Sequence, residues 1–240
     1  GMENGSFFYS KDNGLTWSQG KVKDYSKINR ILISNNEFII FTYTGVYKST
    51  AEGNSWKRTT SLGVMCSVVN KNDVIFISTQ LGIFRSTDYG DTWVSASDGI
   101  KYNNIEALYA AEDGQIYAGG PTDIGFYVSN DNGNSWNLLS NNFRRINSIF
   151  SNSDNSLFIT DITGLYRSSD KGKSWIQLRS GEVRNLHCSK NYFIVNTPSG
   201  LFRLSDQGEI WEYLPVELHL ETIYDICVAG NGLLFVNSLS

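Results

Sequence analysis

All six tryptophans of this 240-residue chain stand at the same place in a repeated eight-residue string, which we call the octet. The tryptophans are 39, 37, 43, 39 and 36 residues apart. A fixed period of this length is typical of a fold built from copies of one supersecondary unit. The octets are SKDNGLTW at 10–17, STAEGNSW at 49–56, STDYGDTW at 86–93, SNDNGNSW at 129–136, SSDKGKSW at 168–175 and LSDQGEIW at 204–211.

Three apolar segments precede the octets with the same period. Directly before each octet comes a Gly, two apolar residues, a variable residue and usually Ser, as in GVYKS at 45–49, with SFFYS at 6–10 as the first copy. Two earlier runs, such as INRILI from 28 and EFIIFTY from 37, complete the unit. These runs are rich in Ile, Val, Phe and Tyr, which favours strands over helices. Each unit therefore predicts four strands, with the octet at the turn between the third and fourth.

Four strands in about 39 residues are typical of one blade of a β-propeller. We expect an all-β, six-bladed β-propeller with four-stranded blades, forming a single domain over residues 1–240. The chain begins in a third strand and ends in a second strand. Pairing of the C-terminal first and second strands with the N-terminal third and fourth strands would complete the sixth blade and remove the open edge. A one-dimensional solenoid is the alternative, but neither end reads as a polar cap.

The octet pattern S-x-D-x-G-x-[ST]-W resembles the Asp-box, or BNR repeat, of sialidases, sortilin-type receptors, xyloglucanases and photosystem II assembly-factor propellers. The resemblance covers nearly the whole chain. The second octet departs from it with Ala51 at the Asp position, and the last has Leu204 and Ile210 at its hydroxyl positions. The resemblance implies that the octet turns lie on the face opposite the ligand site.

Each residue type that recurs in the octets suits a tight hairpin. The Asp can accept turn N–H groups, the Gly can adopt a positive φ, and the Ser or Thr hydroxyl can bond within the loop. The Trp is expected to clamp the hairpin to its own blade. We therefore assign a structural role to Asp12, Asp88, Asp131, Asp170, Asp206, Trp17, Trp56, Trp93, Trp136, Trp175 and Trp211.

Charge and composition narrow the function classes. The net charge is −4 without blocks of like charge, so we expect neither nucleic acid nor an anionic membrane as a partner. No apolar run is long enough for a membrane span. Cys66, Cys188 and Cys227 are far apart in apolar runs, which predicts buried free thiols rather than a disulfide framework or a metal site. Only two histidines occur, and no nucleotide-binding motif is present, so we expect no cofactor or metal.

Two expectations concern the setting of the protein. The start, GMENGSFF, lacks a charged segment followed by an apolar one and predicts no signal peptide. The resemblance instead implies a secreted or periplasmic protein, so the compartment stays open. We expect a monomer. Calcium at Asp-rich turns such as 131–134 is disfavoured because the hairpin already uses those carboxylates.

The face to search for a ligand is formed by the loops between second and third strands and by the connections from one blade to the next. Candidate binding residues there are Arg30, Arg145, Arg184, Tyr224 and Glu106. Weak catalytic candidates are Asp123, Asp161, Tyr224 and Asp225, because a glycosidase needs two carboxyl groups across a cleft. Another basic set recurs at one position of the third strand, in Lys48, Arg85, Arg167 and Arg203. We interpret this set as solvent-facing stems rather than as an anion patch.

These residues favour a non-catalytic binding or scaffold propeller that presents a rigid face to a protein or a glycan. The alternative is a sialidase-like or xyloglucanase-like glycoside hydrolase acting at the channel mouth. Arginines and a tyrosine on different blades are loosely similar to a sialidase floor. The Arg-Ile-Pro string of those enzymes is absent, however, and the loops are short, so we lean away from an enzyme.

Overall fold

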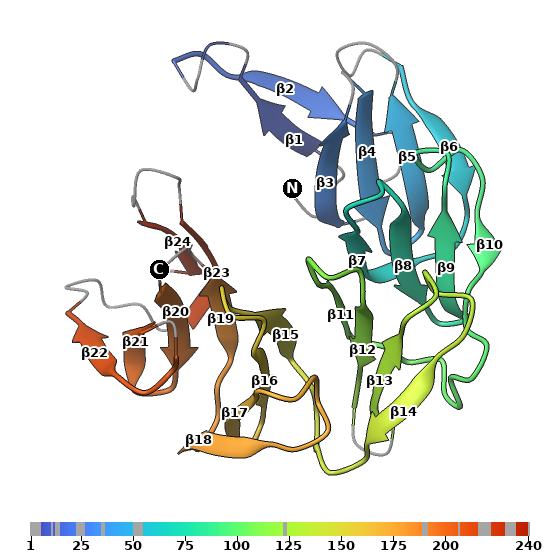
Figure 1. The fold of residues 1–240 in the computed structure, drawn as a ribbon. Helices are drawn as coiled ribbons and strands as arrows, with labels where there is room; N and C mark the ends of the chain where they lie inside the picture. Colours follow the sequence, from blue (N-terminus) through green and yellow to red (C-terminus); the bar gives the residue numbers. More distant parts are fainter. Residues whose placement is uncertain are drawn as a thin grey trace. The chain divides into compact units, whose positions relative to one another are not determined.

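In the computed structural model, the described residues are 6–10, 12, 15–22, 27–34, 37–49, 55–121, 124–188, 192–205, 207–215, 222–228 and 234–239. All regular structure in these ranges is β-strand (Figure 1). None of the described residues forms a helix that could span a membrane.

Five four-stranded antiparallel sheets, numbered I to V here, follow one another along the chain. In each sheet the strands are ordered as they occur in the sequence. Sheet I contains β3 (Ile28–Ser34), β4 (Glu37–Thr42), β5 (Gly45–Ser49) and β6 (Lys57–Thr60). Sheet II contains β7 (Val64–Val69), β8 (Ile75–Thr79), β9 (Gly82–Ser86) and β10 (Val94–Ser95). Sheet III contains β11 (Ala107–Ala110), β12 (Ile116–Gly119), β13 (Phe126–Ser129) and β14 (Asn137–Ser140).

The remaining strands complete the pattern. Sheet IV contains β15 (Ser148–Ser151), β16 (Leu157–Asp161), β17 (Gly164–Ser168) and β18 (Ile176–Ser180). Sheet V contains β19 (Asn185–Cys188), β20 (Tyr192–Thr197), β21 (Gly200–Ser205) and β22 (Trp211–Leu214). Two hairpins, β1 (Ser6–Tyr9) with β2 (Ser18–Lys21) and β23 (Thr222–Val228) with β24 (Leu234–Leu239), are separate two-stranded sheets. The predicted meander of four strands is therefore confirmed in five complete sheets.

The chain divides into two compact units, one of residues 1–116 and 129–137 and the other of residues 117–128 and 138–240. The first hairpin lies in the first unit and the last hairpin in the second. The predicted pairing of these hairpins into a sixth sheet is not among the pairings that the structure describes. A closed six-bladed ring therefore remains a prediction.

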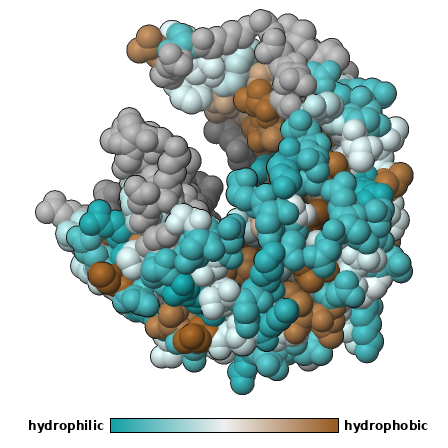
Figure 2. Space-filling model, in the orientation of Figure 1, coloured by the Kyte–Doolittle hydropathy of each residue, from teal (hydrophilic) through white to brown (hydrophobic). Residues whose placement is uncertain are grey.

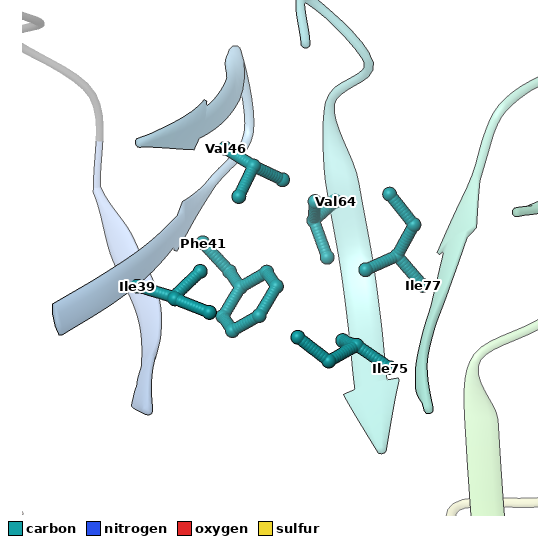
Figure 3. Close-up of a cluster of buried hydrophobic side chains, with 6 residues drawn as sticks. All are labelled: Ile39, Phe41, Val46, Val64, Ile75 and Ile77. Carbon is teal, nitrogen blue, oxygen red and sulfur yellow. The ribbon is translucent and has the colours of Figure 1, made fainter. Parts of the chain in front are cut away.

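The core of the first unit lies between neighbouring sheets. Ile39 and Phe41 of β4 and Val46 of β5 face Val64 of β7 and the isoleucines of β8, Ile75 and Ile77 (Figure 3). Each of these six side chains is at most 1 % exposed. Both faces of the inner strands are thus covered, which explains why they read as continuous apolar runs rather than as an alternating pattern.

Aromatic rings dominate the core of the second unit. Phe150, Phe158 and Phe193 meet with ring centroids 4.9 to 5.1 Å apart, which joins β15 and β16 to β20. Phe126 and Tyr117 stack at 5.5 Å. Hydrophilic residues cover most of the face drawn in Figure 2, and hydrophobic ones appear there as scattered patches. The buried apolar area thus lies inside and between the sheets of each unit.

Candidate functional site

The octet aspartates hold their own hairpins together. In Asp131, Oδ1 accepts hydrogen bonds from the Ser135 N–H at 2.9 Å and the Ser129 hydroxyl at 2.8 Å, and Oδ2 accepts the Ser135 hydroxyl at 2.6 Å. The Ser129 hydroxyl in turn accepts the N–H of Gly133 at 2.8 Å. The same three bonds reach Asp12, Asp88 and Asp170 from their own octets. Asp206 and Ala51 lie outside the described residues.

These bonds keep the four carboxylates ionised. The hydroxyl and N–H donors at the seventh octet position lower the pKa of Asp12, Asp131 and Asp170 from 3.8 to about 2. For Asp88, burial pushes the pKa upward, but the bonds from Thr92 and Ser86 outweigh it and the pKa again falls to about 2. A group with such a pKa is a poor general acid near neutral pH.

The octet tryptophans bond their own hairpins, as expected, since the indole N–H of Trp93, Trp175 and Trp211 donates to the glycine carbonyl of the same octet. The octet glycine and tryptophan also contact the preceding sheet, which the sequence did not predict. Trp136 is 3 % exposed, and its indole N–H donates to the Ala96 carbonyl in the segment after β10 at 2.8 Å. Gly133, with φ of +79°, lies so close to Phe76 of sheet II that an added Cβ would be 2.5 Å from the ring. The octet of sheet III is therefore seated on sheet II.

Three other octets contact the preceding sheet in the same way. Trp93 donates to Thr59 of sheet I at 3.3 Å, and Trp175 meets the Phe126 ring of sheet III at 5.6 Å. The Arg179 guanidinium of sheet IV lies 4.5 Å from the Trp211 ring. Trp17 differs because it is 63 % exposed. Its hairpin is the one with no preceding sheet in its own unit.

Two of the four cations on the third strand, Lys48 and Arg85, are directed at the next octet, so the expectation of solvent-facing stems is wrong for them. Lys48 is 9 % exposed, and its ammonium pairs with Asp91 at 2.8 Å and Glu37 at 3.0 Å. Arg85 donates to the carbonyl of Asn132 and to Asn134 Oδ1 at 2.6 Å. These cations link neighbouring sheets and are already paired, which disfavours an anion patch.

Two predicted binding residues interact with the half-buried Cys66 in the first unit. The Arg30 guanidinium donates to the Ser67 carbonyl, and Arg30 and Glu106 both interact electrostatically with Cys66. Burial raises the pKa of the Cys66 thiol to about 12, the Ser78 hydroxyl counteracts it, Glu106 adds to it and Arg30 opposes it. The structure therefore brings Arg30 and Glu106 to the same region of β7.

All the other predicted binding and catalytic residues belong to the second unit, whereas Arg30 and Glu106 belong to the first. Arg145 is exposed, and exposed Arg184 meets Glu182 at 3.3 Å. In β23 a bulge separates Ile223 from Asp225, so Tyr224 is the extra residue of that strand. The side chains of Tyr224 and Asp225, and all of Asp123, lie outside the described residues.

Asp161 caps a hairpin turn. It is 1 % exposed, its Oδ1 accepts the N–H groups of Thr163 and Gly164 at 2.6 and 2.9 Å, and its Oδ2 accepts the Arg144 N–H at 3.2 Å. The Thr163 hydroxyl donates to Oδ1 as well, at 2.5 Å. Three other sheets have a threonine at this position of the repeat, and each hydroxyl bonds the same turn: Thr42, Thr79 and Thr197. Because the equivalent threonines of three other sheets close the same turn, we assign Asp161 a structural role in its own turn.

The turns that these residues cap carry exposed apolar side chains, a feature that the sequence reasoning missed. Tyr43 is 57 % exposed, Leu81 66 % and Ile162 46 %, and Pro198 is also exposed. Turns normally carry Gly, Pro, Asn, Asp or Ser, so Tyr43, Leu81 and Ile162 are unexpected at such tips, whereas Pro198 is a common turn residue. The signal was present in the strings TYTG, TQLG, DITG and TPSG. We call these four residues the turn tips.

A groove of about 650 Å³ lies in the second unit beside β14. Its aromatic floor is formed by Phe143, Tyr166 and Trp175, with Phe143 5.1 Å from Trp175 and 5.3 Å from Tyr166. Polar and aliphatic residues make the walls: Leu138, Leu139, Ser140, Asn141, Asn142, Lys173, Ser174 and Gln177. The lining contains one cation and no carboxylate. In the part of the chain that the structure describes, no group of three or more His, Cys, Asp or Glu could hold a metal.

Comparison with solved structures shows the fold. YCF48 bound to D1 peptide matches with a TM-score of 0.75 and 17 % identity, over 97 % of this chain and 82 % of that one. The GH74 xyloglucanase from Xanthomonas campestris matches with a TM-score of 0.72 and 16 % identity, over 90 % and 43 %. The extracellular domain of the hybrid two-component system BT3049 from B. thetaiotaomicron matches with 0.74 and 14 %, over 96 % and 34 %.

These neighbours are β-propellers, and this chain shares their fold. It spans about a third, 31 %, of an ancestral GH74 enzyme that also matches. No family model matches the sequence, and no curated protein does. At such low identity the likeness carries the fold but not the activity.

Proposed function

We propose that this protein is a non-catalytic β-propeller that binds a protein partner through its turn tips. The observation that carries the proposal is the exposure of Tyr43, Leu81 and Ile162 at the turn ends of three sheets, where turn chemistry requires no apolar residue. Exposed aromatic and aliphatic side chains on a rigid frame provide contact area with little loss of side-chain freedom on binding. A peptide complex of the similar YCF48 supports a protein as the ligand class.

The environment of the carboxylates supports binding over catalysis. The octet aspartates hold turns with a pKa of about 2, and Asp161 is buried under four donors. A glycosidase needs one carboxyl group that stays protonated and a second one across the cleft. A glycan ligand and hydrolase activity are the competing proposals, favoured by the likeness to GH74 enzymes.

We further propose that the octets are Asp-box repeats and that six blades close a ring. The 63 % exposure of Trp17, against 3 % for Trp136, supports this, because a sheet placed before the first hairpin would cover Trp17. The last hairpin, β23 with β24, supplies the two inner strands that the first hairpin lacks. Deletion of residues 1–20 should then lower the melting temperature of the whole chain, and an unchanged melting temperature would argue for an open array.

The binding proposal is tested with surface variants. Leu81→Asp and Tyr43→Asp place a charge on two tips and should abolish capture of the natural partner from the source organism. Ile210→Asp is the matched control, because Ile210 is 70 % exposed but lies in an octet. Equal partner loss in all three variants, or none in the tip variants, would contradict a turn-tip interface.

Catalysis is tested on chromogenic sialosides and β-glucosides, together with a glycan array. We expect no turnover. Turnover that disappears in Tyr224→Phe or Asp225→Asn would overturn the non-catalytic proposal and favour the hydrolase. Binding to glycans without turnover would instead replace the protein ligand by a sugar.

A further inference from the structure

The groove beside β14 has the features of a peptide-binding site. Three consecutive residues of β14, Leu138, Leu139 and Ser140, line it, so the groove follows the strand. Sheet III ends at β14, which leaves one edge of this strand without a partner strand in the described residues. Alternate N–H and C=O groups of such an edge point outward and can pair with an added strand.

The floor of the groove accepts an apolar side chain. Phe143 is 7 % exposed and meets both Trp175 and Tyr166 edge to face. The polar ends of those two rings are already bonded inside the protein. The Trp175 N–H donates to the Gly172 carbonyl at 3.1 Å, and the Tyr166 hydroxyl lies 2.6 Å from the Thr163 hydroxyl. The rings therefore offer apolar surface rather than hydrogen bonds.

The lining also contains polar side chains and one charged side chain. Lys173 is exposed and is the one charged residue of the lining. The side-chain amides of Asn141 and Asn142 form no hydrogen bond with another described residue. Amide groups can pair with a peptide backbone. The Lys173 ammonium forms no ion pair with a described residue, because the nearby Asp170 carboxylate is bonded to Ser174, and a free ammonium favours an acidic ligand. A volume of about 650 Å³ is within the range of ligand sites.

We propose that this groove binds an extended peptide segment that pairs with the edge of β14, inserts one apolar side chain onto the aromatic floor and places a carboxylate at Lys173. Strand addition at a sheet edge uses backbone bonds for affinity and a side-chain pocket for specificity. This is a second binding site in addition to the turn tips, and it does not depend on them.

The probe is an array of end-blocked octapeptides of alternating Thr and Val, with Leu or Phe at the fourth position and Asp or Lys two or four residues later. Residues at this spacing share one face of an extended chain. We expect the Asp peptides to bind at least tenfold more tightly than the Lys peptides. Lys173→Glu should reverse the order, and N-methylation of alternate backbone amides should abolish binding.

The matched control is Lys57→Glu. Lys57 is an exposed residue of β6 that does not line the groove, so this variant should leave the order of peptide affinities unchanged. Leu81→Asp should also leave it unchanged, which separates this site from the proposed function. Three outcomes would overturn the proposal: no peptide binds, N-methylated peptides bind equally well, or Lys173→Glu leaves the preference for Asp unaltered. Glycan binding that is lost in Asn142→Ala, with no peptide binding, would show a sugar site instead.

Discussion

In sheets II and IV, where the structure describes both ends of the third strand, the two ends contrast in how they use their polar and apolar groups. At the octet end, the aspartate and hydroxyls bond one another, and the glycine and tryptophan contact the preceding sheet. At the turn-tip end, one buried Thr or Asp closes the turn, and an apolar residue faces solvent. The residue types at the octet end are thus explained by packing and hydrogen bonding within the fold. The exposed apolar residues at the turn-tip end are not explained in this way. The second end is therefore the better place to look for function.

The largest expected effect is at the most buried octet tryptophan. Trp136→Ala removes a side chain that is 3 % exposed and leaves the Ala96 carbonyl without its donor, so it should lower the free energy of unfolding by about 3–5 kcal/mol. Trp17→Ala, at 63 % exposure, is the comparison and should cost far less. Urea denaturation followed by circular dichroism measures both. Similar losses would mean that Trp17 is buried in solution.

An octet aspartate should have an intermediate effect. Asp131→Ala leaves the Ser135 N–H and two hydroxyls without their acceptor and should cost about 1–3 kcal/mol. Glu112→Gln, an exposed loop residue of the same unit, is the control and should cost about 0.5 kcal/mol or less. If both variants unfold at the same urea concentration, the octet carboxylate does not stabilise its hairpin.

The same carboxylates predict a dependence on pH. Their pKa is about 2 in the folded chain and near 3.8 in the unfolded chain. Since the folded pKa is the lower one, the stabilisation is complete above about pH 4 and is lost as the pH falls through about 2. Thermal unfolding between pH 2 and pH 6 should show this loss. Asp131→Asn should show a shallower decline, and an identical slope would contradict the assignment.

The ion pairs of Lys48 should contribute little. Lys48→Met removes contacts with Glu37 and Asp91, whose side chains are 34 % and 49 % exposed and regain water. We expect a change of about 1 kcal/mol or less in the free energy of unfolding. A double-mutant cycle with Asp91→Asn measures the coupling, and a coupling above about 2 kcal/mol would show that water does not reach the pair.

The smallest effect on stability is expected at a turn tip. Leu81 is 66 % exposed, so Leu81→Asp should change the free energy of unfolding by about 0.5 kcal/mol or less. Chemical denaturation measures this change. A loss comparable to that of Trp136→Ala would show that the tip packs against the protein, and the contrast between the two ends would then disappear.

Sequence reasoning recovered the strands because the octet and the apolar runs repeat with one period. It located the first three strands of each of the five complete sheets and placed a fourth after the octet, since turn chemistry and apolar runs are local signals. It could not show which sheet an octet contacts, because Phe76 and Gly133 are 57 positions apart and no local pattern joins them. For the same reason it took Lys48 for a solvated side chain.

The candidate site was less predictable. Asp161 was considered because a carboxylate near a loop can be catalytic, whereas its equivalence to Thr42 and Thr79 becomes plain only once the turns are aligned by their hydrogen bonds. The groove at Phe143 was not predicted, because it combines residues of β14, β17 and the octet turn of sheet IV. Such a site has no single sequence signature.

The seating of an octet on the sheet before it gives the chain a direction. When a ribosome delivers the polypeptide from its N-terminus, the surface on which Trp136 rests, in sheet II, has already been synthesised, and the same is true of Trp175 and sheet III. Each new octet turn can therefore dock on a sheet that has already been synthesised.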